Sequence, residues 1–347
     1  LIRGVIVPSQ SALSLNVLSH PAKANKLLAN SAGCPATPTS EFLECLTNLD
    51  LQVLLSAQRN LSNVDKSFGR PWFGPSLDST FNGNPNIRDR ILPETPYELI
   101  MKGAGKDIPM ILGVVENEAL TARARVTNDK AWLEELNKNA SAIVNLLHYD
   151  LVLPTNEIPR IGKTLKKVYF GKENISKSNS LLLQEMIGHV WSQRTIRLAA
   201  ELHSLTNPSI YLYIFIQRGA FSWASKFGIY KEGPTSGDEM YYLFPHLKIP
   251  QFWPGVVHPA DMEFSKKLVG LYASFIKTGK PSLYWGNKWS PLEIIEKLDA
   301  EVKLPWYSIG PEPKDVEFRP LPESRYKMLD EILSYYETTQ ISWKAGD

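Results

Sequence analysis

The sequence predicts an α/β fold with a largely parallel central sheet. Two near-continuous apolar runs, "IPMILGVV" at 108–115 and "SIYLYIFI" at 209–216, are rich in β-branched and aromatic residues, which is typical of strands covered on both faces. Amphipathic helical patterns lie between and after these runs. Strands that alternate with helices usually join a parallel sheet, so this order favours a sheet flanked by helices.

Another predicted strand lies near the start of the chain. In "LIRGVIVPSQSAL" an apolar run at 5–7 ends at Pro8 and a serine-rich turn, which indicates a buried strand. A core strand at this position would expose an unpaired edge. We therefore expect an N-terminal companion segment, outside this chain, to complete the sheet, and we expect residues 1–347 to be insoluble without it.

Two helices are predicted from apolar residues at helical spacing. The first contains Leu183, Ile187, Val190 and Trp191, and the second contains Phe264, Leu268, Leu271, Tyr272 and Phe275. Gly279 and Pro281 in "KTGKP" end the second helix. Residues 120–180 are polar and helix-rich, and we interpret them as an insertion that flanks the sheet.

The charge balance argues against a nucleic-acid partner. The chain has 347 residues, and its 38 Lys and Arg against 36 Asp and Glu give a net charge of +2, without the basic run that marks a nucleic-acid or membrane arm. No apolar segment approaches the roughly 18 residues that cross a bilayer, and no signal-peptide pattern is present. Any signal or membrane anchor is expected outside this chain.

The two cysteines and three sequons point to an oxidising compartment. Cys34 and Cys45 lie eleven positions apart, so they are either unrelated buried thiols or the ends of a small disulfide loop. Two cysteines without a nearby histidine supply too few ligands for a metal site. Asn-x-Ser sequons stand at Asn60, Asn139 and Asn174, in contexts that suit exposed turns.

Several segments in one order resemble a known family. They are "LIRGVIVPSQSAL", "GC" followed by "ECL", "FGPSLDS", "ILPETPYELIMKG", "IPMILGVVENEA", "IYLYIF", "SGDEMYYLF" and "YASFIKTGKP". Together they resemble the C-terminal two-thirds of a type-B carboxylesterase or cholinesterase-like α/β-hydrolase. The resemblance implies that residues 1–347 are the C-terminal part of one α/β-hydrolase domain, and that Cys34 and Cys45 are bonded.

The resemblance also says where catalytic residues should lie. Such enzymes use a serine nucleophile in G-x-S-x-G, an acid and a histidine, in that order. The chain contains no G-x-S-x-G, and the family's elbow would lie upstream of Leu1. The acid position falls on Glu118 in "GVVENEA", with Ala119 where glycine is usual, so the turn that presents the acid is expected to differ. Without the family, Glu118 reads as a solvated loop residue.

The histidine position is occupied by serine. Family members have G-x-x-H-x-x-E before an aromatic segment, and "GPTSGDEMYYLF" aligns Glu239, Tyr242 and Phe244 while placing Ser236 under the histidine. A hydroxyl group is not basic near neutral pH, so we expect an ordinary loop residue and no catalysis. The other histidines match no catalytic or metal-ligand spacing; they are His20, His148, His189, His203, His246 and His258. No cofactor or metal is implied.

Two functions remain open. The first is a catalytically deficient adhesion protein, neurotactin-like or neuroligin-like, whose membrane-anchored ectodomain binds a protein ligand of the immunoglobulin superfamily at the cell surface. The resemblance to the neurotactin-like branch implies a secreted immunoglobulin-family ligand, and it leaves room for a homodimer. The alternative is an active secreted carboxylesterase whose nucleophile lies upstream of this chain.

Overall fold

The protein is described by a computed structural model that covers residues 2–14, 21–64, 72–77, 90–151, 153–244, 258–282, 288–298, 304–311, 314–316 and 322–339. The strands within these ranges form one sheet in the order β1-β2-β3-β4-β5. Their bounds are β1 Val5–Pro8, β2 Met110–Val115, β3 Ile210–Phe215, β4 Trp306–Ile309 and β5 Lys314–Val316. The first four run parallel, and β5 is antiparallel to β4.

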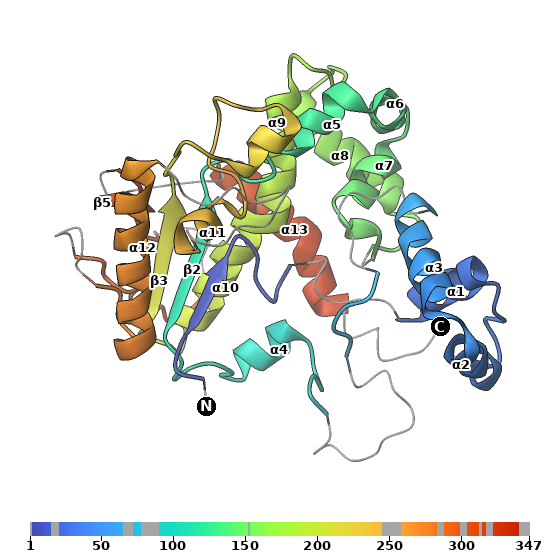
Figure 1. Ribbon diagram of the computed structural model, residues 1–347, viewed down its shortest axis with the longest axis horizontal. Helices are drawn as coiled ribbons and strands as arrows, with labels where there is room; N and C mark the ends of the chain where they lie inside the picture. Colours follow the sequence, from blue (N-terminus) through green and yellow to red (C-terminus); the bar gives the residue numbers. More distant parts are fainter. Residues whose placement is uncertain are drawn as a thin grey trace.

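Helices account for most of the remaining described chain (Figure 1). Their bounds are α1 Pro21–Ala32, α2 Thr39–Asn48, α3 Leu51–Val64, α4 Pro96–Met101, α5 Ala122–Asn128, α6 Lys130–Lys138, α7 Ala140–Leu146, α8 Ile158–Phe170, α9 Ser180–Gly188, α10 Arg194–Ser204, α11 Asp238–Leu243, α12 Pro259–Thr278 and α13 Glu323–Thr339. A π-helical turn, His189–Gln193, joins α9 to α10, and short 3-10 helices cover Tyr149–Leu151 and Trp223–Phe227.

The sheet lies between α12 on one face and α10 on the other (Figure 1). Alternate residues of β2 and β3 point to opposite faces because the side-chain period of a strand is two. Tyr211, Tyr213 and Phe215 pack in one cluster with α11 and α12, whereas Leu212 and Ile214 pack with α10. Every residue of β2 and β3 is buried, which explains why both strands are near-continuous apolar runs.

The register of β2 and β3 depends on one glycine. Gly113 lies opposite Tyr213 in the parallel pair, and a Cβ atom at Gly113 would lie 2.0 Å from Cε1 of the tyrosine ring. Tyr213 is fully buried, so its ring has no open space into which it could turn. Glycine therefore makes room for the largest side chain in the neighbouring strand.

Helices α5 to α9 enclose a core of their own beside the sheet. Its buried residues come from α5, α6, α7, α8 and α9, and Tyr326 and Leu329 of α13 complete it. The prediction that residues 120–180 are helix-rich is confirmed. The segment flanks the sheet, as expected, and its helices lie together at the top of Figure 1.

Polar contacts fasten α13 to α10. The hydroxyl group of Tyr326 donates a 2.9 Å hydrogen bond to Glu201, which also forms a 2.8 Å ion pair with Arg197. The Arg197 guanidinium group lies 3.6 Å from the centre of the Tyr326 ring. A second ion pair, 2.9 Å long, joins Arg194 to Asp330. Buried ionised groups require such partners, so α10 and α13 form one packed unit.

The predicted elements agree with the structure. Strands were expected at 5–7, 108–115 and 209–216, and β1, β2 and β3 occupy these positions with ends shifted by one or two residues. Helix α12 ends at Gly279, whose φ of 72° is in the left-handed region that glycine adopts readily. Helix α9 also matches its prediction, although the apolar pattern at Val190 and Trp191 continues into the π-helical turn.

Candidate functional site

The turn after β2 presents the residue at the predicted acid position. The side chain of Glu118 turns back to the strand, and Oε1 accepts a 3.0 Å hydrogen bond from the Val115 N–H group. Only 2% of Glu118 is exposed, so the expectation of a solvated loop residue is wrong. Burial comes from a distant element, because α9 packs against it: a Cβ atom on Gly188 would lie 2.9 Å from Cβ of Glu118.

Ala119, where the family usually has glycine, has a left-handed backbone. Its φ is +55°, in the left-handed region that costs a non-glycine residue roughly 1 kcal/mol. Alanine therefore adopts a conformation that glycine would adopt without strain. The substitution of the usual glycine is accommodated by the backbone, and Glu118 remains buried.

Ser236 lies beside Glu118 although 118 residues separate them. Its hydroxyl group donates a hydrogen bond to Oε2 of Glu118. The two loops are joined by backbone contacts as well: the Asn117 N–H group donates to the Pro234 carbonyl at 3.1 Å, and the Asn117 side chain donates to the Gly233 carbonyl at 3.1 Å. The structure thus brings together the two residues that the resemblance assigns to the acid and histidine positions.

Asp238 shapes the turn that carries Ser236. One carboxylate oxygen accepts a 3.0 Å hydrogen bond from the Thr235 N–H group, and the other accepts a 2.7 Å bond from the Trp223 N–H group. Gly237, with φ of 91°, follows Ser236 and leads into α11. These contacts hold Ser236 at the surface while its hydroxyl group reaches the buried carboxylate.

Burial raises the pKa of Glu118, because an ionised carboxylate loses its hydration there. The Ser236 hydroxyl group, the Val115 N–H group and the hydroxyl groups of Ser9 and Ser192 oppose this shift by favouring the ionised form. Ser9, directly after β1, was not singled out from the sequence; it adopts φ of 63° there, and its buried hydroxyl group has no hydrogen-bond partner within bonding distance among the described residues.

A second buried carboxyl group shares this region. Glu239 is fully buried and accepts a 3.2 Å hydrogen bond from the Tyr213 hydroxyl group. Burial raises its pKa to about 8, a backbone hydrogen bond lowers it, and the charge of Glu118 raises it further. The family pattern placed Glu239 on a glutamate position. It gave no sign that the charge of Glu118 would raise the pKa of Glu239.

The histidines of the described ranges have other surroundings than Glu118. Among those residues, no histidine hydrogen-bonds to Glu118. His189 Nδ1 contacts the Tyr169 hydroxyl group at 2.8 Å, His148 stacks on Trp191, and burial lowers the pKa of His203. His258 precedes α12 at the surface. His20 and His246 lie outside the described residues.

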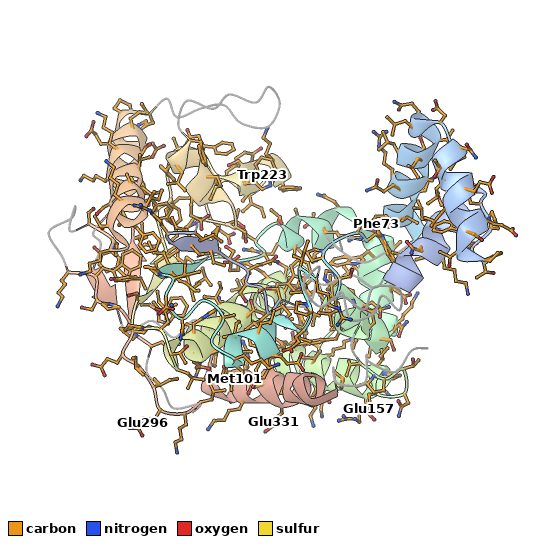
Figure 2. All side chains as sticks on the ribbon, turned by 90° about the horizontal axis from the view of Figure 1, so that it is seen from below. Phe73, Met101, Glu157, Trp223, Glu296 and Glu331 are labelled. Atoms are coloured by element: carbon orange, nitrogen blue, oxygen red, sulfur yellow. A yellow bond between two sulfur atoms is a disulfide. The ribbon has the colours of Figure 1, made fainter. Side chains whose placement is uncertain are left out.

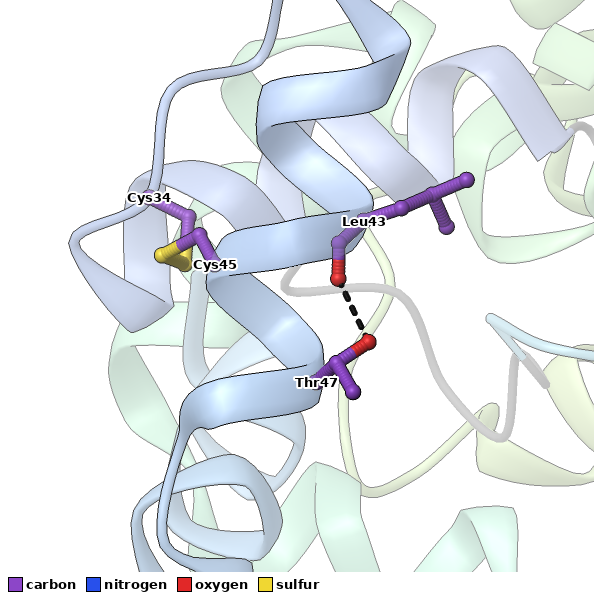
Figure 3. Close-up of a disulfide and its surroundings, with 4 residues drawn as sticks. All are labelled: Cys34, Leu43, Cys45 and Thr47. Atoms are coloured by element: carbon purple, nitrogen blue, oxygen red, sulfur yellow. Dashed lines mark hydrogen bonds between the residues drawn. A yellow bond between two sulfur atoms is a disulfide. The ribbon is translucent and has the colours of Figure 1, made fainter.

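The predicted disulfide is present between Cys34, after α1, and Cys45, in α2 (Figure 3). The Cα atoms are 5.9 Å apart. In the chain-entropy model such a loop contributes roughly 3 kcal/mol of stability. The alternative of two unrelated thiols is therefore wrong.

The sequons differ in their structural contexts. Asn174 is exposed in the turn after α8, and Asn139 is exposed between α6 and α7, where its Oδ1 accepts a 3.0 Å hydrogen bond from the Ser141 N–H group. Asn60 is exposed but lies inside α3. The expected turn is therefore wrong for Asn60. No cluster of three or more potential ligand side chains in the described chain could hold a metal ion.

The sheet order, the helices on both faces and the buried acid after a strand define the class of α/β-hydrolase folds. Consistent with this class, the juvenile hormone esterase structure from Manduca sexta, solved with OTFP covalently attached, superposes with a TM-score of 0.73 at 20% identity, over 97% of this chain and 60% of that one. The family model for the carboxylesterase family matches residues 1–320. The chain belongs to the carboxylesterase family.

Curated relatives include esterases and a neuroligin. A carboxylic ester hydrolase of Bombus ignitus is 28% identical over 80% of this chain and 48% of its own length. Juvenile hormone esterase of Tribolium castaneum is 23% identical, over 85% and 52%. Neuroligin-2 of Rattus norvegicus is 24% identical, over 81% and 32%. The chain thus spans about half the length, or less, of these relatives.

Proposed function

We propose that the protein is a catalytically inactive member of the carboxylesterase family that acts at the cell surface by binding another protein. The observation that carries the proposal is the Ser236 hydroxyl group on the Glu118 carboxylate. In a serine hydrolase this position belongs to the group that accepts the nucleophile's proton and returns it to the leaving group. A neutral hydroxyl group performs neither step near neutral pH.

The hydrogen bonds of Glu118 favour a structural role for this residue over a role in proton transfer. Glu118 uses one oxygen to bind the Val115 backbone and the other to bind Ser236. These bonds join the loop after β2 to the loop before α11. Glu239, with its raised pKa, is protonated across much of the neutral range, which makes it a hydrogen-bond donor rather than a base.

The proposed adhesion role is supported by similarity to a neuroligin and by the disulfide bond. Neuroligin-2 is among the relatives, and the Cys34–Cys45 disulfide suits an extracellular protein. Among the described residues no helix has the length and apolar character to cross a membrane. Within the adhesion branch we favour a neurotactin-like receptor for a secreted immunoglobulin-family ligand.

An active secreted carboxylesterase is the competing function. The esterase names among the relatives support it. It would require a nucleophile outside this chain and a base other than residue 236. Glu118 and Glu239 are two buried carboxyl groups at this site. Variants at these two positions therefore distinguish an active esterase from an inactive protein.

The test uses the complete protein, expressed from a eukaryotic secretory host. We expect no turnover of p-nitrophenyl acetate or acetylcholine, and no labelling by an organophosphate. Cells that display the protein should bind purified immunoglobulin-family ectodomains. A rate comparable to an active carboxylesterase, lost in Glu118→Gln but retained in the surface control Glu134→Gln, would establish the competing function.

Location is tested separately by mass spectrometry without reductant. We expect Cys34 and Cys45 to be linked, and sugar on at least one of Asn60, Asn139 and Asn174. Two free thiols and unmodified asparagines in protein made by a eukaryotic secretory host would count against an extracellular protein.

A further inference from the structure

Helix α8 has an apolar face and a basic face. Ile161, Leu165 and Tyr169 are buried in the core that α5 to α9 share. Lys163 and Lys167 are exposed on the other side, one helical turn and about 6 Å apart along the axis. Lys172, which is also exposed, follows in the turn after the helix ends at Gly171. We refer to Lys163, Lys167 and Lys172 as the α8 lysine row.

The charge of this segment stands out from the rest of the chain. Residues 157–177 contain six basic and two acidic side chains, whereas the whole chain has a net charge of only +2. Both acidic groups have partners: Glu157 pairs with Arg160 at 2.5 Å, and Glu173 accepts a 3.2 Å hydrogen bond from Asn179. Within the described ranges, no carboxylate forms an ion pair with a member of the α8 lysine row.

Interaction with the helix dipole does not explain the presence of all three lysines. A cation in the last turn interacts favourably with the helix dipole, and this applies to Lys167. Lys163 lies a turn earlier, and Lys172 lies beyond the end of the helix, where the dipole effect has faded. The ammonium groups of Lys163 and Lys167 lie on neighbouring turns and repel one another, and an anion that lies across them would offset this repulsion.

We infer that the α8 lysine row binds a sulfated polysaccharide of the extracellular matrix. Rows of exposed lysine bind linear polyanions, since each ammonium group that neutralises an anionic group releases a condensed counterion. The row is accessible, because all three of its lysines are exposed; Glu157, which precedes α8, lies near the lower edge of the view in Figure 2.

Nucleic acid, anionic lipid and protein are less suitable ligands for the α8 lysine row. The disulfide indicates an oxidising compartment, where nucleic acid is not the usual polyanion. Anionic lipid is concentrated in the cytoplasmic leaflet, so an extracellular face meets little of it. Protein interfaces depend on buried aromatic and apolar anchors and are depleted in lysine, whereas the exposed apolar residue next to the row is a single valine, Val168.

The experiment compares two triple variants of the complete secreted protein. One is Lys163→Ala, Lys167→Ala, Lys172→Ala; the control is Lys106→Ala, Lys277→Ala, Lys280→Ala, which removes the same charge from exposed lysines on other elements. N-glycans are removed from all forms, since Asn174 lies next to the row. Binding of a heparin oligosaccharide is titrated at several salt concentrations, beside chemically desulfated heparin and phosphatidylserine vesicles.

We expect the α8 variant to bind heparin at least about ten-fold more weakly, with a shallower dependence of affinity on salt. The control should change less than about two-fold, and both should unfold at the midpoint of the unchanged protein. An equal loss in the control would overturn the inference, as would binding of desulfated heparin with equal affinity. Vesicle binding that depends on the row, without heparin binding, would assign the row to a membrane instead. The outcome does not depend on esterase activity.

Discussion

The Ser236 hydroxyl group donates a hydrogen bond to Glu118, so an exposed serine has a buried carboxylate as its partner. The bond links the loop after β2 to the turn before α11, and it favours the ionised form of Glu118 against the effect of burial. The predictions that follow concern the stability of the described fold and are to be measured on the complete protein.

Ser236→Ala should lower the free energy of unfolding by about 1 kcal/mol near neutral pH, because it removes a hydrogen bond from a buried carboxylate. The loss should shrink at acidic pH, where Glu118 is protonated. Denaturant unfolding of Ser236→Ala, Glu118→Gln and the double variant measures the coupling. Additive effects of the two substitutions would show that the bond contributes nothing.

Stability should fall as the pH rises from about 5 to about 8. Glu239 has a folded-state pKa of about 8, above its ordinary value, so the folded state binds more protons than the unfolded state in this window and loses stability as they dissociate. Glu239→Gln should flatten the pH dependence and gain about 1–3 kcal/mol at pH 8. Thermal unfolding across the window measures both effects. The surface variant Glu134→Gln should retain the original slope, and an unchanged slope in Glu239→Gln would refute the assignment.

Ala119→Gly should stabilise the protein by about 0.5–1 kcal/mol, because glycine adopts the observed φ of +55° without strain. Alanine-to-glycine changes normally act in the opposite direction. The matched control is Ala131→Gly on the exposed surface of α6, which should cost about 1 kcal/mol. If both variants were destabilised equally, the backbone at Ala119 would not be strained.

Gly113→Ala should destabilise the protein by about 2 kcal/mol or more, since the added methyl group would overlap the buried Tyr213 ring. Calorimetry or denaturant unfolding measures the loss. In a Tyr213→Leu background, which removes the ring, the same Gly113→Ala change should cost clearly less. An equal cost in both backgrounds would locate the strain elsewhere.

Strands β1, β2 and β3 and helix α12 were predictable because their signals are local, whereas the short strands β4 and β5 were not predicted. Strands covered on both faces are apolar along their whole length, as in "SIYLYIFI", and a helix that ends in a left-handed residue often has glycine there, as at Gly279. The sequence segments and the structural elements therefore coincide at these positions.

The environment of Glu118 was not predictable in the same way. Residue types at positions 116–119 suggest a solvated turn, but Gly188 on α9 and Ser236 before α11 bury the carboxylate from 70 and 118 residues away along the chain. Family resemblance selected the correct pair of positions. The resemblance could not predict that Glu118 raises the pKa of Glu239, because this effect depends on the burial of both carboxyl groups in the packed interior.

The contact between Glu201 and Tyr326 sets a minimum delay during protein synthesis. The two residues are 125 positions apart, which corresponds to about 6–25 seconds of translation at ordinary ribosomal rates. Throughout that interval α10 has emerged without the aromatic ring that covers Arg197 and the hydroxyl group that binds Glu201. This face of the nascent chain therefore remains uncovered until Tyr326 has been synthesised.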